Sequence, residues 1–363
     1  MTIKHLEEYR DPQISRKIVE HIKNLNQKQI RLMEVCGTHT MSIFRSGIPS
    51  ILPDTISLLS GPGCPVCVTA QGEIDACIEL AGIDDVIITT FGDLMRVPGA
   101  DSSLQNQRAN GRDIRMVYST FDALEVARKN PEKKVVFLGI GFETTAPTIA
   151  ASIVTANEMN LDNYFVFSAH KLLPPALFTL MESRNTKIDG FLLPGHVSVI
   201  IGTKAYLPFF EQYHIPSVIA GFEPVDILQA IFMLVEQIET GNPELANGYQ
   251  RAVTFDGNRK AQAIMQKVFE TADANWRGLG TIPKSGLKIR KEFAAFDAQN
   301  VFGIEIGETE DPKGCACGEI LLGLKTPPEC PLYKRECTPL QPIGPCMVSS
   351  EGTCAAYHRY HDI

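Results

Sequence analysis

The chain has 363 residues, of which 44% are hydrophobic and 21% charged, and this composition excludes disordered, collagen-like and coiled-coil architectures. Its formal net charge of −8 has the wrong sign for a general nucleic-acid binder, which must neutralise phosphates. No apolar run approaches the ~20 residues of a membrane-spanning helix, and the charged N-terminus lacks the apolar core of a secretory signal, so we expect a cytoplasmic protein without nucleic-acid or membrane partners.

Eight short runs rich in β-branched residues predict the strands of parallel sheets. They are apolar on both faces, as strands covered by helices are, and the segments between them are long enough for crossover helices. The first set comprises Ile30–Val35, Ile56–Leu59, Val86–Thr90 and Ile114–Tyr118. The second set comprises Lys134–Leu138, Tyr164–Phe167, Gly190–Leu193 and Pro216–Ile219.

The two sets repeat, because corresponding runs begin 102 to 108 residues apart. We therefore predict two similar α/β domains in tandem that face a cleft, over residues 1–130 and 131–244. A helix over Val225–Thr240 closes the second domain. Within the remaining region, residues 245–363, we expect a helix over Asn258–Thr271 and then an irregular tail rich in Pro, Gly and Cys. A tail of this kind buries little apolar area and is expected to need a metal centre as its core.

The loops after the first two strands carry cysteine and histidine, at the sheet edge where parallel α/β proteins bind ligands. Glu34–Thr40 (EVCGTHT) contains Cys36 and His39, and Cys36 is either a ligand or a small core residue. Gly61–Cys67 (GPGCPVC) contains Cys64 and Cys67, a C-x-x-C just ahead of a helix. This spacing permits a redox disulfide or a two-sulfur metal site, and half of a structural zinc site is the alternative.

Two loops of the second set carry further candidates. Gly141–Pro147 (GFETTAP) contains Glu143, which is either an acid/base group or a charge at a helix N-terminus. Pro194–Ser198 (PGHVS) contains His196, which is a ligand, a proton donor or an ordinary loop histidine.

Six of the ten cysteines lie in the last 49 residues. In a reducing compartment such thiols favour metal or redox chemistry over structural disulfides. Four thiolates can hold a 4Fe-4S cluster or a zinc ion, and the long, uneven spacings favour the cluster because structural zinc sites use closely spaced pairs. Spacing alone does not select four of the six, and the remaining two could form a disulfide beside the cluster. The six are Cys315, Cys317, Cys330, Cys337, Cys346 and Cys354.

In their order and joint presence, these motifs resemble those of the HypD family of nickel–iron hydrogenase maturation proteins. The resemblance rests on EVCGTHT, GPGCPVC, GFETTAP, PGHVS and the cysteine-rich tail, and it runs over essentially the whole chain.

The resemblance implies an assembly scaffold with redox activity rather than a conventional turnover enzyme. With a small HypC-type chaperone, such a scaffold holds the iron on which two cyanides and one carbon monoxide are assembled as Fe(CN)2CO. Cyanide comes from a HypE-type donor, supplied in turn by a HypF-type carbamoyl transferase, and the finished group passes to the hydrogenase large subunit.

The positions of the matching motifs imply roles for individual residues of such a scaffold. Cys36 is the implied thiolate ligand of the iron, with His39 beside it. Cys64 and Cys67 are an implied redox-active pair near the same cleft and further candidate ligands of that iron.

In the tail, the resemblance implies four ligands of a 4Fe-4S cluster, namely Cys315, Cys330, Cys337 and Cys354. It implies an accessory thiol pair, Cys317 and Cys346, close to that cluster. Two alternatives stay open: an iron–sulfur thiol–disulfide oxidoreductase that acts on a partner protein, and a zinc-stabilised binding module without a redox role.

Overall fold

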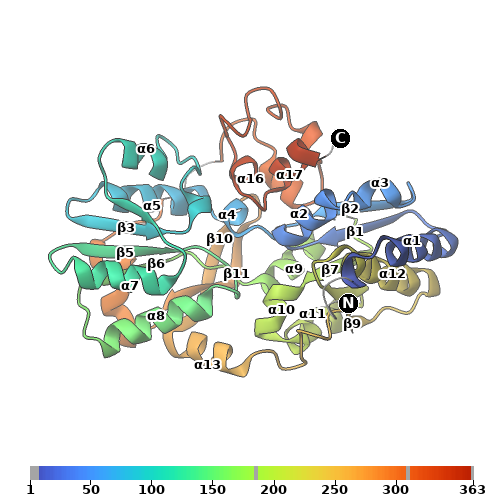
Figure 1. Ribbon diagram of the computed structural model, residues 1–363, viewed down its shortest axis with the longest axis horizontal. Coiled ribbons are helices and arrows are strands. Elements are labelled where there is room, and N and C mark those ends of the chain that lie inside the picture. Colours follow the sequence, from blue (N-terminus) through green and yellow to red (C-terminus); the bar gives the residue numbers. More distant parts are fainter. Residues whose placement is uncertain (1–7, 184–186, 308–310, 361–363) are drawn as a thin grey trace.

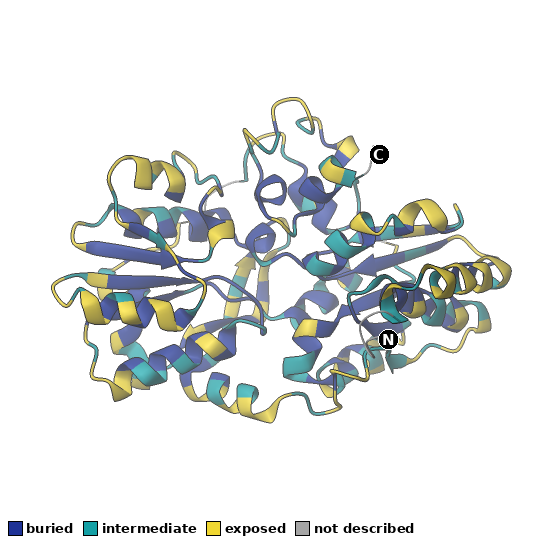
Figure 2. Cartoon of the chain, viewed as in Figure 1, coloured by how far each residue is buried: buried dark blue, intermediate teal, exposed yellow. Residues whose placement is uncertain are grey.

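Two parallel β-sheets lie side by side along the long axis of the molecule, with an antiparallel hairpin between them and the cysteine-rich tail packed above (Figure 1). The structure is a computed structural model that describes residues 8–183, 187–307 and 311–360. Figure 2 shows buried residues along the strands of both sheets and at the centre of the molecule, with exposed residues along the outer helices. None of the helices in the described ranges has the length and apolar character needed to traverse a membrane.

The larger sheet has five parallel strands in the order β2-β1-β7-β8-β9. Helix α12 (Pro224–Thr240) packs against β7 and β8, and α1 (Pro12–Leu25) packs against α12. Apolar side chains of these strands and helices share one buried core. The strands are β1 (Ile30–Glu34), β2 (Ile56–Ser60), β7 (Gly190–Pro194), β8 (Ser217–Ala220) and β9 (Leu245–Asn247).

The smaller sheet has four parallel strands in the order β4-β3-β5-β6. All five residues of β3 are buried, as predicted for a strand covered on both faces. Helix α5 (Gln71–Gly82) packs against β3, and α7 (Thr120–Lys129) packs against β5. The strands are β3 (Val86–Thr90), β4 (Ile114–Met116), β5 (Lys134–Gly139) and β6 (Tyr164–Ser168).

The tandem arrangement predicted from the repeat is wrong in its pairing of strands. After β2 the chain leaves the larger sheet, forms all four strands of the smaller sheet and returns to the larger sheet at β7. Each sheet therefore contains two strands of the first predicted set and two of the second. A hydrophobic run identifies a strand but not its neighbour, because crossover connections let a parallel strand join any edge within reach. Gly190 lies in register with Leu32 where β7 pairs with β1, and a Cβ on it would be 3.2 Å from the Leu32 side chain, a tight contact. The domain boundaries after residues 130 and 244 stay predictions.

Further helices lie between and after these strands. The first part of the chain also contains α2 (Gly37–Arg45), α3 (Ile48–Ile51), α4 (Pro65–Val68), α6 (Leu104–Ala109), α8 (Ala146–Glu158), α9 (Leu173–Glu182), α10 (Gly195–Ile201) and α11 (Leu207–Tyr213). The later part contains α13 (Arg259–Val268), α14 (Ala298–Phe302), α15 (Cys317–Leu321), α16 (Pro345–Val348) and α17 (Thr353–Tyr360).

The hairpin of β10 (Phe269–Trp276) and β11 (Gly280–Ile289) joins the two halves of the molecule. It begins inside the helix predicted over Asn258–Thr271, of which the structure forms only α13. Trp276 forms a bridge with Thr69, two residues after Cys67, and its ring lies 5.9 Å from the ring of Phe142, in the loop after β5 of the smaller sheet. The indole Nε1 donates to the Ser285 hydroxyl at 2.8 Å, so the buried polar group is satisfied.

We expect Trp276→Ala to lower the free energy of unfolding by about 3–5 kcal/mol, because it leaves a large cavity where the hairpin meets both halves. Trp276→Phe, the matched control, keeps most of the apolar volume and is expected to cost less. Urea unfolding followed by circular dichroism measures both variants. Equal midpoints for Trp276→Ala and the wild type would contradict this role of the hairpin.

Candidate functional site

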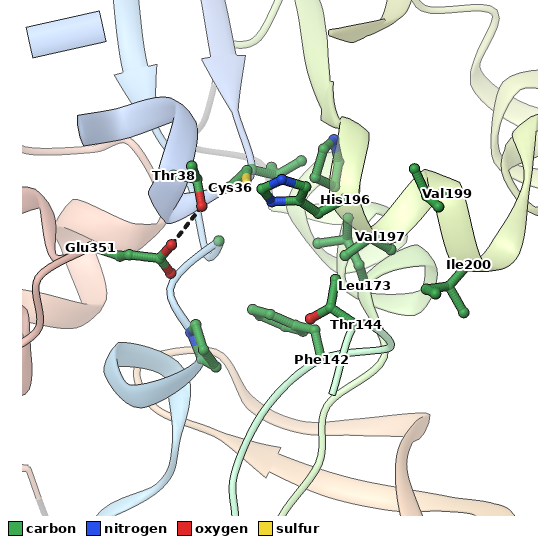
Figure 3. Close-up of a pocket in the computed structure, with 14 residues that line it drawn as sticks. Cys36, Thr38, Phe142, Thr144, Leu173, His196, Val197, Val199, Ile200 and Glu351 are labelled. Atoms are coloured by element: carbon green, nitrogen blue, oxygen red, sulfur yellow. Dashed lines mark hydrogen bonds between the residues drawn. The ribbon is translucent and has the colours of Figure 1, made fainter. Parts of the chain in front are cut away.

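A pocket of about 340 Å³ lies where the loops after β1, β2, β5 and β7 meet the tail (Figure 3). These are the strand ends at which the sequence predicted a site. Most of the lining is apolar, and the polar side chains that reach it are few. The lining residues are Val35, Cys36, Thr38, Gly63, Pro65, Phe142, Thr144, Leu173, Pro194, His196, Val197, Val199, Ile200 and Glu351.

Cys36 is held at the wall of this pocket by its neighbours in the loop. It directly precedes α2, and its backbone N–H donates to the Glu34 carboxylate at 2.8 Å. Gly37 N–H donates to the Gly63 carbonyl at 2.9 Å. Gly63 lies so close that a Cβ on it would be 2.0 Å from the Cys36 nitrogen, so only glycine fits there. The thiol is therefore fixed by backbone contacts from two loops.

Burial raises the pKa of the Cys36 thiol to about 12, and the nearby carboxyl of Glu351 acts in the same direction. Cys36 is 8% exposed, so its thiolate would be poorly solvated. The free thiol is consequently protonated near neutral pH, and a bound cation is required to compensate the thiolate charge.

Glu351 is a pocket residue that the sequence analysis missed. It lies in the turn between α16 and α17, and its carboxylate accepts a hydrogen bond from the Thr38 hydroxyl at 2.5 Å. Gly37 makes room for it, because a Cβ on Gly37 would be 2.5 Å from the Glu351 Cβ. Burial raises the pKa of the Glu351 carboxyl. No periodicity or motif spacing points to this turn, since only the tertiary fold brings it to Cys36.

The two predicted histidines both stack against the Phe222 ring. The ring centroids are 4.7 Å apart for His39 and 3.8 Å apart for His196. His39 Nε2 contacts the Gly221 carbonyl at 2.9 Å, and burial lowers the pKa of His39 to about 4, so this ring is neutral. His39 is fully buried behind the wall, whereas His196 lines the pocket. Their catalytic roles stay predictions.

Glu143 does not line the pocket, whereas Phe142, which precedes it, and Leu173, its hydrogen-bond partner, do. One carboxylate oxygen accepts the Leu173 N–H at 3.0 Å, and the other has no hydrogen-bond partner among the described residues. Burial raises the pKa of Glu143 to about 7. The hydrogen bond from Leu173 to Glu143 fixes the start of α9. The acid/base role predicted for Glu143 stays a prediction.

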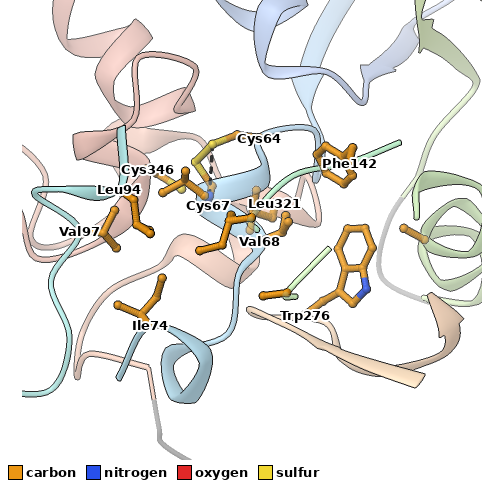
Figure 4. Close-up of a cluster of buried hydrophobic side chains, with 14 of the residues drawn as sticks. Cys64, Cys67, Val68, Ile74, Leu94, Val97, Phe142, Trp276, Leu321 and Cys346 are labelled. Atoms are coloured by element: carbon orange, nitrogen blue, oxygen red, sulfur yellow. Dashed lines mark hydrogen bonds between the residues drawn. A yellow bond between two sulfur atoms is a disulfide. The ribbon is translucent and has the colours of Figure 1, made fainter. Parts of the chain in front are cut away.

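Cys64 and Cys67 form a disulfide with a Cα–Cα distance of 5.2 Å. Both are buried at the start of α4 and lie beside Cys346, Val68 and Leu321 in an apolar cluster (Figure 4). The structure thus contains the disulfide form of the C-x-x-C, and the redox activity predicted for the pair stays a prediction. Their predicted role as iron ligands would require the reduced form and stays a prediction.

All six tail cysteines surround one small cavity. The Cys317 and Cys346 sulfurs are 2.8 Å apart, and side-chain contacts continue from Cys317 to Cys315 and from Cys346 to Cys354. The tail therefore brings together both the four predicted cluster ligands and the predicted accessory pair.

The donor set of this cavity fits a 4Fe-4S cluster. The Ile343 N–H donates to the Cys337 sulfur at 3.4 Å, which is the kind of hydrogen bond that stabilises cluster thiolates. Gly344 leaves room for sulfur, because a Cβ there would be 2.9 Å from the Cys315 Sγ. Across the described ranges, no three His, Cys, Asp or Glu side chains converge as around a single ion. A cluster requires no such convergence, since its four cysteines bind four different irons. The enclosed space is about 10 Å³, so the side chains must separate to accept a cluster.

Comparisons with known proteins agree with the motifs. A family model described as "HypD: Hydrogenase formation hypA family" matches residues 13–361. The chain is 46% identical over 368 residues to the hydrogenase maturation factor HypD of Cupriavidus necator, covering 99% of this chain and 97% of that protein. It is 43% identical over 366 residues to the hydrogenase maturation factor HypD of Escherichia coli, covering 99% and 98%. A putative hydrogenase expression/formation protein of Methanocaldococcus jannaschii is 42% identical over 355 residues, covering 97% and 99%.

The buried carboxyl of Glu143 predicts a pH effect on stability. Its pKa is raised to about 7 in the folded protein from 4.5, so the folded state binds more protons between these values. This group therefore makes stability fall as pH rises from 4.5 to 7, and the loss is complete above pH 7. Glu143→Gln is expected to flatten that part of the profile, measured by urea unfolding at several pH values. An unchanged slope would show that Glu143 titrates normally.

Proposed function

Because the chain belongs to the HypD family of hydrogenase maturation factors, we propose that it is the scaffold on which Fe(CN)2CO is assembled, with Cys36 as the protein ligand of the iron. The observation that carries this proposal is one fixed cysteine at the wall of a largely apolar pocket, well separated in sequence from the six-cysteine cavity. Iron that carries cyanide and carbon monoxide is soft and prefers thiolate over carboxylate ligands.

The residues around Cys36 support a cargo site for that iron. Apolar side chains such as Phe142, Leu173 and Val197 exclude water from bound diatomic ligands. Thr38, Glu351 and His196 supply the polar contacts, so the site combines a soft ligand with few competing hard ones. The pocket is partly open to solvent, which leaves space for a HypC-type chaperone to bring a second cysteine to the iron.

We further propose that Cys315, Cys330, Cys337 and Cys354 hold a 4Fe-4S cluster as a resident cofactor. When bound, such a cluster supplies one-electron transfer. Cys317 and Cys346, with sulfurs 2.8 Å apart, are the accessory thiol pair. The Cys64–Cys67 disulfide near the pocket can accept two electrons when it is reduced to two thiols. A HypE-type cyanide donor, a HypF-type carbamoyl transferase upstream and the hydrogenase large subunit downstream complete the proposed partners.

A thiol–disulfide oxidoreductase that acts on a partner is the second candidate, and the Cys64–Cys67 disulfide favours it. The burial of this pair opposes it, because Cys64 is 4% and Cys67 1% exposed, so a partner's disulfide reaches neither sulfur without an opening of the structure. Multiple-turnover reduction of a disulfide substrate by the isolated protein would favour this candidate. Tail thiols that hold zinc in place of iron and labile sulfide would instead favour a binding module.

Cys36→Ala is expected to abolish the infrared bands of metal-bound cyanide and carbon monoxide in the anaerobically purified complex with its small chaperone. The tail cluster should keep its visible absorption, because the two cysteine sites are separate. Cys77→Ala is the matched control, since Cys77 is buried in α5 and lines neither site. Normal cyanide bands in Cys36→Ala would rule out Cys36 as an obligatory ligand.

Cys337→Ala should bleach the cluster absorption and lower the iron and labile sulfide content, because it removes one of four thiolate ligands. The tail should also become more sensitive to proteolysis, since small irregular domains depend on their metal centre. Cys77→Ala serves again as the control. Full iron and sulfide content in Cys337→Ala would overturn the ligand assignment.

A further inference from the structure

Ser349 contacts one sulfur of the Cys64–Cys67 disulfide. It follows directly after α16 and is 1% exposed, and its Oγ lies 3.3 Å from the Cys64 Sγ. Because a disulfide sulfur carries no hydrogen, the serine hydroxyl must be the donor of this hydrogen bond. The residue comes from the tail, 285 positions along the chain from Cys64.

The two sulfurs of the pair have different surroundings. Cys64 Sγ accepts a second hydrogen bond, from the Cys67 backbone N–H at 3.2 Å. In the described parts of the chain, Cys67 Sγ receives none, and it lies among apolar side chains that include Val68 and Leu321 (Figure 4). Two donors therefore converge on one sulfur and none on the other.

This asymmetry decides how the disulfide opens. When a thiolate attacks a disulfide, one sulfur forms the new bond and the other leaves with the negative charge. Hydrogen bonds to a charged acceptor are about twice as strong as those to a neutral one, so they favour release of the sulfur that they contact.

We propose that Ser349 is a positioning residue that makes Cys64 the sulfur released as thiolate on reduction, so that the attacking thiolate bonds to Cys67. This inference deepens the redox role proposed above for the pair and rests on it.

The step balances with a dithiol as reductant. Because Cys67 is only 1% exposed, the structure must first open around the pair. The first thiolate of the reductant then bonds to Cys67 Sγ while the Cys64–Cys67 bond breaks, and Cys64 keeps the electron pair. The second thiol of the reductant then loses its proton and attacks the first sulfur, which releases Cys67 to take up that proton. The reductant becomes a disulfide, and the pair gains two electrons.

The same serine connects the pair to the pocket. Its Oγ accepts the Glu351 N–H at 3.2 Å, and Glu351 in turn accepts the Thr38 hydroxyl. Ser349 thus connects the Cys64 sulfur to Glu351, whose carboxylate lies near Cys36.

The first test compares Ser349→Ala with Ser350→Ala, its matched neighbour, whose hydroxyl donates instead to Asp93. The Cys64–Cys67 pair of the full-length protein is equilibrated anaerobically with glutathione buffers and quantified by mass spectrometry. Ser349→Ala should shift the equilibrium about tenfold toward the disulfide, a midpoint about 30 mV more negative. Ser350→Ala should match the wild type, and Ser349→Thr, which keeps the hydroxyl, should keep a midpoint close to that of the wild type. A Ser349→Ala midpoint equal to that of the wild type would overturn the proposal.

A second test uses the wild type and needs no variant. The oxidised protein is exposed briefly to 2-mercaptoethanol, quenched in acid and mapped by mass spectrometry. We expect the adduct on Cys67 with Cys64 free, and an adduct mainly on Cys64 would contradict the assignment. Neither test involves the iron cargo, so a failure here is distinguishable from normal cyanide bands in Cys36→Ala, which would instead refute the role proposed for Cys36.

Discussion

The close approach of backbone at two glycines is the constraint on which the pocket depends. Gly63 lies against the Cys36 backbone, and Gly37 lies against Glu351, at distances that leave no room for a Cβ. These contacts bring together the loop after β1, the loop after β2 and a turn of the tail. With any larger residue at position 63 or 37, the C-x-x-C or Glu351 would be displaced from Cys36. Close backbone packing at these two glycines therefore sets the relative positions of the three segments, without any bound ligand.

Burial then sets the chemistry of what these loops present. It raises the pKa of Cys36 to about 12 and lowers that of His39 to about 4, so this thiol is protonated and this imidazole is neutral near neutral pH. Glu34, which holds the Cys36 N–H, has its pKa raised to about 7 for the same reason. Such surroundings favour a bound cation at sulfur over a free thiolate. The tail adds a second concentration of sulfur, and Ser349 joins the two regions through its contacts with Cys64 and Glu351.

The sequence predicted the elements and the loops that matter, because both are local properties. Strands such as Val86–Thr90 follow from apolar runs, and Cys36 and His196 follow from the rule that ligands meet strand ends. The sheet pairing, in which β1 joins β7, depends on contacts between distant segments that no local pattern encodes. Glu351, Phe222 and Ser349 escaped detection for the same reason, since each reaches the site only through the tertiary fold. The family comparisons support the function of the whole chain but do not test the role of any one residue.

Location of the cargo iron tests the central claim most directly. The protein would be purified anaerobically with its small chaperone, crystallised, and mapped by anomalous diffraction at the iron edge. The account predicts one iron peak in the pocket beside the Cys36 sulfur, in addition to the iron held by the tail cysteines. Iron density confined to the tail, in a complex whose infrared spectrum shows metal-bound cyanide, would contradict it.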